Sequence, residues 1–223
     1  MQGHKKIYLI LLLAILVLSI FVIIAIKQTS QIKIKNDSKP VIDTEITPIT
    51  IEKEDPILGN RGAEITIIEF LNFGTCKEEC RLNQQKLMNF VLQHPLKTRL
   101  VWKDAPSGNI LSSSNNELAH VTAYCVGAKD EKKFWEFVNF LTNTEEKISK
   151  DKLYESFKKL EIPESYMQEC LASDKSTEKI GNSFGMARTL NLKGNLNLFI
   201  DNKKIFLDKD RDILEILDRL LEE

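Results

Sequence analysis

Hydrophobic positions divide the chain into three regions. Residues 7–26 form one apolar run with a single serine and no charged residue. Residues 27–55 are mostly polar and contain prolines, and one short edge strand is expected among them, at 46–51. From residue 56 to 223, β-branched runs alternate with stretches in which apolar residues recur every three or four positions. This pattern predicts a membrane-spanning segment, a linker and an α/β domain.

The domain is expected to begin with a strand–helix–strand unit. Residues 65–71 and 98–103 have the β-branched, apolar composition of buried strands. Between them the spacing predicts a helix over about 76–92, which His94 and Pro95 end. The remaining pattern predicts helices at about 116–128, 131–142, 149–160, 164–172 and 176–190, then a hairpin of 196–200 and 203–206, then a helix from about 209.

The first apolar run has the length of a transmembrane helix. About 20 residues at a rise of about 1.5 Å span the roughly 30 Å hydrocarbon core. The apolar region of a cleaved signal peptide is shorter, so we interpret residues 7–26 as an uncleaved signal anchor. Basic residues flank both ends and do not set the orientation, but a long domain is readily exported. Residues 1–6 are therefore expected to be cytoplasmic and the domain extracytoplasmic, as in a single-pass membrane protein.

Charge and cysteine content narrow the function classes. The chain has 31 Lys and Arg against 32 Asp and Glu, a net charge of −1, and no basic cluster, which argues against a nucleic-acid partner. Its 4 cysteines are too few for a disulfide scaffold but sufficient for one redox pair and one structural bridge. No cofactor site is expected from the sequence.

Four stretches resemble the DsbA-like thioredoxin family. Residues 58–70 lead into and include the first core strand, and residues 101–106 contain the Lys-Asp-x-Pro end of the second strand. Residues 134–137 match the aromatic helix of the insertion, and residues 193–204 match a loop, an apolar strand and a turn. The resemblance covers roughly residues 55–221. It implies an α/β thioredoxin-like fold in residues 56–223 with a helical insertion at about 112–175, preceded by the one transmembrane helix.

The chain departs from this family at two functional positions. The family motif is C-x-x-C, whereas Cys76 and Cys80 have three residues between them. The family also has a cis-proline in its substrate-binding loop, where this chain has Asn195 and Leu196. A cis bond without proline costs about 2.5 to 4 kcal/mol, so we expect a trans bond in this loop.

Cys76 and Cys80 are the candidate catalytic residues. A helix amino terminus lowers a thiol pKa, and four helical residues place the two Cα atoms about 6 Å apart, within disulfide range. Glu78 and Glu79 oppose the thiolate and Lys77 favours it, which predicts a less oxidising pair than in a strong disulfide donor. Cys76 would attack a substrate and Cys80 would resolve the mixed disulfide.

Two other interpretations of the pair stay open. It can be a static or vestigial pair in a catalytically inactive, protein-binding thioredoxin module. Residues 73–80 also resemble the copper loop of Sco-type chaperones, in which thiolates bind Cu(I). That site requires a downstream histidine, and the histidines here are His4, His94 and His120. We therefore expect no metal ligands.

The resemblance also bears on the other two cysteines. Cys125 and Cys170 fall on two predicted helices of the insertion, and exported DsbA-like proteins sometimes bridge such helices. A bridge closing about 46 residues would stabilise the fold by about 4 kcal/mol, although free cysteine is also a common buried residue. His120, at the start of a predicted helix, is interpreted as a capping or surface group.

Together these features predict a membrane-anchored, extracytoplasmic thiol-disulfide oxidoreductase-like protein. Its expected partners are substrate proteins with cysteines, a redox partner in the membrane, and the lipid bilayer through residues 7–26.

Overall fold

The computed structural model describes residues 42–105, 115–144, 147–193, 196–207 and 212–222. The expected cytoplasmic head, the predicted span at 7–26 and the first part of the linker lie outside these residues. Among the described residues, no helix combines the length and the apolar character needed to cross a membrane. All of them belong to one unit of the chain, Pro40–Glu223.

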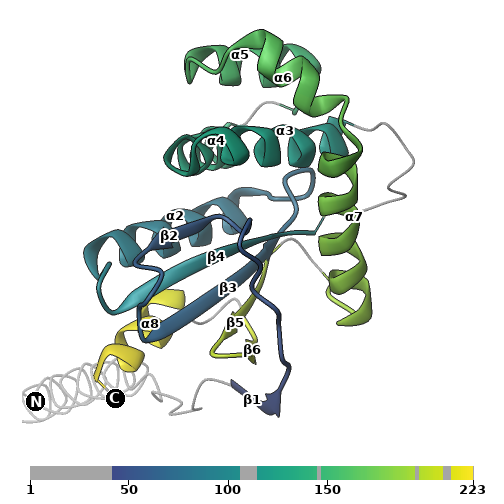
Figure 1. Cartoon of the computed structure of the whole chain (residues 1–223). Coiled ribbons are helices and arrows are strands. Elements are labelled where there is room, and N and C mark those ends of the chain that lie inside the picture. Colours follow the sequence, from purple (N-terminus) through teal and green to yellow (C-terminus); the bar gives the residue numbers. More distant parts are fainter. Residues whose placement is uncertain (1–41, 106–114, 145–146, 194–195, 208–211, 223) are drawn as a thin grey trace, which may run out of the picture. The chain divides into compact units, whose positions relative to one another are not determined.

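A six-stranded sheet organises this unit (Figure 1). Its central strands β3 (Ile65–Leu71) and β4 (Thr98–Asp104) run parallel. A hairpin of β5 (Leu196–Ile200) and β6 (Lys203–Ile205) continues the sheet, with β5 antiparallel to β3. In the chain, one helix separates β3 from β4 and several helices separate β4 from β5. The predicted strand–helix–strand unit and the late hairpin are therefore confirmed.

Two short strands cover the edges of the sheet. β1 (Ile42–Ile46) pairs antiparallel with β6, and β2 (Ile57–Gly59) pairs antiparallel with β4. The strand expected at 46–51 is thus displaced, since β1 ends at Ile46, and β2 was not expected at all. Ile49, only 7% exposed, packs in the core. The second half of the predicted linker therefore belongs to the folded domain.

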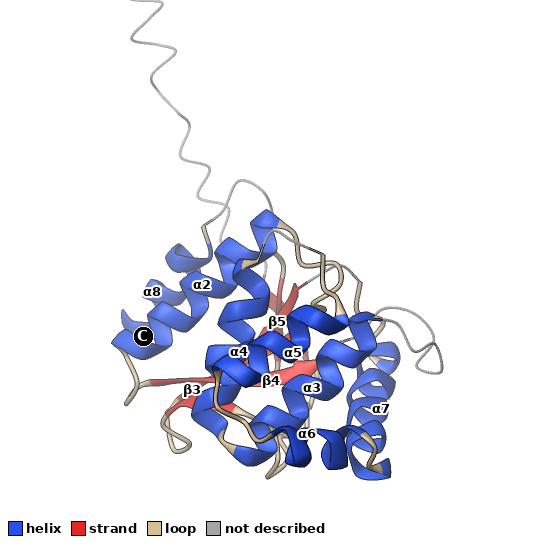
Figure 2. Ribbon diagram, turned by 90° about the horizontal axis from the view of Figure 1, so that it is seen from above, coloured by secondary structure: helices blue, strands red, loops and turns tan. Residues whose placement is uncertain are grey.

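The alternation of β3 divides the apolar side chains between two cores. The helices on either side are α2 (Glu78–Gln93), α3 (Asn115–Lys129), α4 (Glu131–Asn143), α5 (Lys150–Lys159), α6 (Glu164–Leu171), α7 (Asp174–Thr189) and α8 (Ile213–Glu222). Ile67 and Leu71 pack on one face with α2, α3, α4 and α8, whereas Ile68 and Phe70 pack on the other with α7. Figure 2 shows the first group of helices over the sheet, and Figure 1 shows α5 and α6 stacked outside α3 and α4.

Every predicted helix of the domain has a counterpart, usually within two residues of its predicted ends. Local chemistry explains several boundaries: the side chains of Asp130, Ser149 and Ser173 accept hydrogen bonds from backbone N–H groups in the first turns of α4, α5 and α7. The start of α2 is the functionally relevant difference. This helix begins at Glu78, so Cys76 lies in the preceding loop and not in the first turn.

The helical insertion contains the second pair of cysteines. Cys125 in α3 and Cys170 in α6 form a disulfide across 45 positions of the chain. The Tyr166 hydroxyl donates to the carbonyl oxygen of Cys125 at 3.0 Å and adds a second link between the same helices. The bridge therefore joins the outer helix α6 to α3, the helix that contacts the candidate site.

Candidate active site

Cys76 and Cys80 form a disulfide at the start of α2. Their Cα atoms are 5.2 Å apart, within the usual disulfide range. Cys76 lies in the loop between β3 and α2 and is half-buried, whereas Cys80 lies inside the helix and is 6% exposed. The two sulfur atoms therefore differ in access, and a reactant from solvent can reach Cys76 far more readily than Cys80.

Two asparagines hold the loop that carries Cys76. The Asn72 carbonyl oxygen accepts from the Cys76 N–H at 3.0 Å. The Gly74 N–H donates to Asn72 Oδ1 at 3.0 Å and to Asn116 Oδ1 of α3 at 2.6 Å. A Cβ on Gly74 would lie 2.6 Å from Asn116 Cγ, so any other residue here would displace the Asn116 side chain that holds the loop. The position of Cys76 thus depends on α3 as well as on its own loop.

The first turn of α2 surrounds the pair with opposing charges. Lys77 precedes the first helical residue, and its side chain makes no capping hydrogen bond. Glu78 and Glu79 occupy the first turn, and both are exposed. The unpaired N–H groups of a helix amino terminus stabilise a thiolate, and the two carboxylates oppose it. The expected modest acidity of Cys76 stays a prediction.

A buried carboxyl group lies under the same helix. Gln84 follows Cys80 by one helical turn, and its Nε2 donates to Glu69 Oε1 at 3.1 Å. Glu69 is fully buried, and this burial raises its pKa to about 8, although the Gln84 hydrogen bond acts in the opposite direction. At neutral pH the Glu69 carboxyl is therefore mostly protonated. Sequence reasoning missed it, although an acidic residue inside an apolar strand was a usable signal.

A second buried polar group supports the loop through Phe73. His120 is fully buried, and its Nδ1 lies 2.7 Å from Asp104 Oδ1, which also accepts from Trp102 Nε1 at 3.0 Å. The Phe73 ring packs against both aromatic partners, with centroids 4.7 Å from His120 and 5.0 Å from Trp102. The interpretation of His120 as a surface or capping group is therefore wrong, because this side chain packs beneath the active-site loop.

The substrate-binding loop predicted from the resemblance is described only in part. Asn195 lies outside the described residues. Leu196 begins β5 and pairs with Leu71, the last residue of β3. Since Leu71 leads into the loop that carries Cys76, Leu196 is at the same end of the sheet as the disulfide. Its role in substrate binding stays a prediction.

A groove of about 710 Å³ opens beside Cys76. Its wall is formed by the active-site loop, the start of α2, the start of α3, and the end of α4 with the segment that follows it. Phe73, Leu141 and Ile148 supply apolar surface, and Lys77, Arg81 and Lys147 supply positive charge. The more accessible cysteine therefore borders a space large enough for a polypeptide segment.

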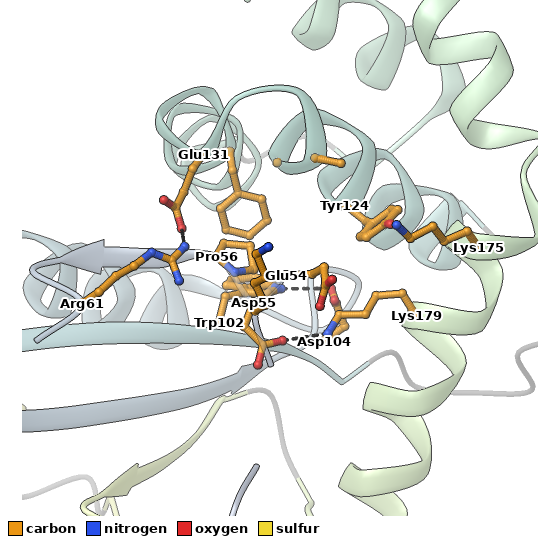
Figure 3. Close-up of a pocket in the computed structure, with 14 residues that line it drawn as sticks. Glu54, Asp55, Pro56, Arg61, Trp102, Asp104, Tyr124, Glu131, Lys175 and Lys179 are labelled. Atoms are coloured by element: carbon orange, nitrogen blue, oxygen red, sulfur yellow. Dashed lines mark hydrogen bonds and ion pairs between the residues drawn. The ribbon is translucent and has the colours of Figure 1, made fainter. Parts of the chain in front are cut away.

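A second cavity, of about 320 Å³, shares no lining residue with this groove (Figure 3). Lys179 Nζ donates to Asp55 Oδ1 at 2.8 Å, and Lys103 Nζ lies 2.5 Å from Asp55 Oδ2. At the opposite wall, Arg61 pairs with Glu131 at 2.6 Å. These ion pairs attach the segment before β2 to α7 and β4, and the residues just after β2 to α4, which indicates a structural role for this region.

Metal ligands do not gather at the candidate site. Among the described residues, no group of three or more His, Cys, Asp or Glu side chains is arranged to hold a metal ion. His94 is the C-cap residue of α2, at the opposite end of that helix from the cysteines.

Comparison with solved structures identifies the fold. A thioredoxin-like oxidoreductase from Silicibacter pomeroyi has a TM-score of 0.62 and 18% identity, over 77% of this chain and 95% of that chain. The thiol-disulfide exchange protein alpha-DsbA2 from Wolbachia pipientis has a TM-score of 0.62 and 20% identity, over 77% and 88% of the two chains. Oxidised BdbD from Bacillus subtilis has a TM-score of 0.62 and 18% identity, over 77% and 95%.

No family model and no curated protein matches the sequence. The structural matches show that the domain has the DsbA-like thioredoxin fold that the sequence motifs predict.

Proposed function

We propose that this protein is a thiol-disulfide oxidoreductase that acts on the cysteines of other proteins through Cys76 and Cys80. The observation that carries the proposal is the asymmetry of the disulfide: Cys76 is half-buried and borders a groove, and Cys80 is buried at the helix start. Such an arrangement directs an incoming sulfur to one member of the pair and reserves the other for resolution.

The exchange is a reversible two-electron reaction. A substrate thiolate attacks Sγ of Cys76, the bond between Cys76 and Cys80 breaks, and its electron pair goes to Sγ of Cys80, which takes up a proton. A second substrate thiolate then attacks the substrate sulfur of the mixed disulfide and releases Cys76. The substrate is oxidised to a disulfide and the protein is reduced to a dithiol. In the reverse direction, the Cys76 thiolate attacks a substrate disulfide and Cys80 resolves the intermediate.

Glu69 supplies the buried proton in this proposal. A thiolate formed at Cys80 is destabilised by burial, so proton uptake favours its release. Burial raises the pKa of Glu69 to about 8, so at neutral pH this carboxyl group holds a proton beneath the helix that carries Cys80. Gln84 contacts Glu69 and lies on the same buried face of α2 as Cys80.

The cellular setting follows from the sequence. Residues 7–26 anchor the protein as a single-pass membrane protein, and the domain acts outside the cytoplasm on substrate proteins with cysteines, with a redox partner in the same membrane. The two disulfides suit an oxidising compartment. Protease protection in intact cells or spheroplasts tests this: removal of the domain by an external protease supports the orientation, and protection of the domain contradicts it.

The test of activity is capture of a mixed disulfide. A Cys80→Ala variant of the full-length chain in detergent should accumulate an adduct on Cys76 when mixed with a protein that contains an accessible disulfide. The Cys76 thiolate attacks that disulfide and releases one substrate thiol, and the mixed disulfide persists because the resolving thiol is absent. The Cys76→Ala variant is the matched control and should accumulate much less. Equal adduct formation by both variants, or none by either, would overturn the proposal.

An inactive binding module is the second candidate. The observation that favours it is the departure at Asn195 and Leu196, where the family has its cis-proline. In that case the protein would bind a partner over the same surface without sulfur exchange. Stable complex formation by the variant that lacks both Cys76 and Cys80, with no adduct by the wild type, would support this alternative.

A further inference from the structure

The groove beside Cys76 combines apolar surface with unpartnered positive charge. Its apolar part comes from Phe73, Leu141 and Ile148. Lys77 and Arg81 approach from α2, and Lys147 follows α4. Throughout the described part of the chain, none of these three cations has an anionic partner, and Glu78 is the one described acidic residue that lines the groove.

We propose that this groove selects substrate segments in which acidic side chains lie beside the reactive cysteine. This inference rests on the proposed function and names its substrate class. A segment that delivers a sulfur atom to Cys76 must pass Lys77 and Arg81, since both line the same groove as Cys76. A carboxylate on that segment gains two or three cationic neighbours against the one like charge of Glu78, whereas a lysine meets three like charges and one carboxylate.

The surroundings strengthen this selection in two ways. Lys77 and Lys147 are exposed, but Arg81 is half-buried and the lining residues Phe73 and Leu141 are only 5% and 4% exposed, so a seated segment displaces water from around Arg81. Charge interactions are screened less where water is excluded. In addition, the amino terminus of α2 contributes partial positive charge at the same place.

The experiment measures the rate at which cysteine peptides reduce the Cys76–Cys80 disulfide of the oxidised full-length chain in detergent. Three peptides differ only at the residues beside the cysteine, which are Glu, Ala or Lys. At low salt we expect the Glu peptide to react about tenfold faster than the Lys peptide, and the difference to shrink near 1 M salt. Equal rates, or a faster Lys peptide, would overturn the inference.

Charge reversal of one groove residue sharpens the test. Arg81→Glu should remove or invert the preference for the Glu peptide. Lys132→Glu, an equal change at an exposed site on α4 outside the groove, should leave the preference unchanged. Loss of preference in both variants would mean that overall charge, and not the groove, selects the peptide.

The uncharged reductant dithiothreitol separates this inference from the proposed function. Each peptide rate is divided by the dithiothreitol rate of the same variant, which removes effects of Arg81 on the disulfide itself. If dithiothreitol reduces the pair reversibly and the peptides show no preference, the substrate class is wrong while the exchange activity stands. If the pair resists reversible reduction by any thiol, the proposed function itself fails.

Discussion

The two disulfides of this domain are chemically identical but occupy different structural settings. Cys76 and Cys80 are 4 positions apart and join a loop to the helix that follows it, whereas Cys125 and Cys170 are 45 positions apart and join two helices of the insertion. Each pair joins a half-buried cysteine, Cys76 or Cys170, to a buried one, Cys80 or Cys125, but Cys76 borders the groove at the start of α2. The comparison teaches that chain separation and a neighbouring groove, and not the bond itself or the burial of its cysteines, separate a candidate redox pair from a structural bridge.

The largest expected difference between the two pairs is in exchange activity. Cys76→Ala should abolish exchange with substrate proteins, because the sulfur that borders the groove and forms the mixed disulfide is lost. The double variant Cys125→Ala/Cys170→Ala should retain exchange at temperatures where it stays folded. Both are measured as the rate of disulfide transfer to a dithiol peptide. Comparable losses in the two variants would remove the functional distinction between the pairs.

Glu69, beneath the helix that carries Cys80, should make the stability of the domain depend on pH. The folded-state pKa of about 8 is above the ordinary value of 4.5, so the folded protein binds more protons than the unfolded chain between these pH values. Stability should therefore fall as pH rises through this window, by up to about 1.4 kcal/mol per pH unit from this group, and level off above pH 8. Urea unfolding from pH 5 to 9 measures the slope.

Glu69→Gln provides the control for this prediction. Glutamine keeps the size of the side chain and cannot ionise, so the variant should show a shallower fall in stability with rising pH. An unchanged slope would mean that Glu69 does not carry the buried proton, and its proposed role at Cys80 would be lost.

The Cys125–Cys170 bridge should contribute more to stability than the Cys76–Cys80 bridge, although it should contribute less to exchange activity. Loop-closure entropy assigns about 4 kcal/mol to the Cys125–Cys170 bridge and about 2 kcal/mol to the short Cys76–Cys80 loop. Denaturant unfolding of the double alanine variants should therefore show the larger loss of unfolding free energy for the Cys125 and Cys170 pair. The reverse order would contradict its assignment as the structural bridge.

The smallest effect is expected where α3 contacts the active-site loop. Asn116→Ala removes one of the two acceptors for the Gly74 N–H, the one that α3 supplies, and should cost about 1 kcal/mol of stability and slow exchange at Cys76. Asn116→Asp keeps an acceptor oxygen and should restore part of the rate. Asn89→Ala changes an exposed asparagine of α2 outside the groove and serves as the matched control. Equal rates in all three variants would show that α3 does not position Cys76.

Local sequence signals predicted most elements and the Cys76–Cys80 pair, whereas the Cys125–Cys170 bridge was implied by the resemblance to DsbA-like proteins. The β-branched run of 65–71 and the three- to four-residue spacing of apolar positions after it are properties of short windows, so they are visible without the fold. The Lys-Asp-x-Pro motif in 101–106 and the C-x-x-x-C spacing further identified the fold and the candidate redox pair. These features coincide with β3, the helices and the two disulfides of the structure.

The supporting residues of the site were less predictable because they depend on packing between elements. Glu69 meets Gln84 across 15 positions, and His120 meets Asp104 across 16, each pair joining a strand to a helix. Edge strands such as β1 and β2 depend on which neighbour is available for pairing, and short polar segments carry little signal of this kind. The span at 7–26 and the role of Asn195 stay predictions from the sequence.

Redox titration of the Cys76–Cys80 pair tests the central claim most directly. The full-length chain in detergent is equilibrated in thiol-disulfide buffers, and alkylation with mass spectrometry follows this pair separately from Cys125 and Cys170. We expect a reversible midpoint between about −120 and −270 mV, the range of working thiol exchangers. A pair that resists reduction to below about −300 mV, or that never forms a disulfide, would contradict the oxidoreductase and favour the inactive binding module.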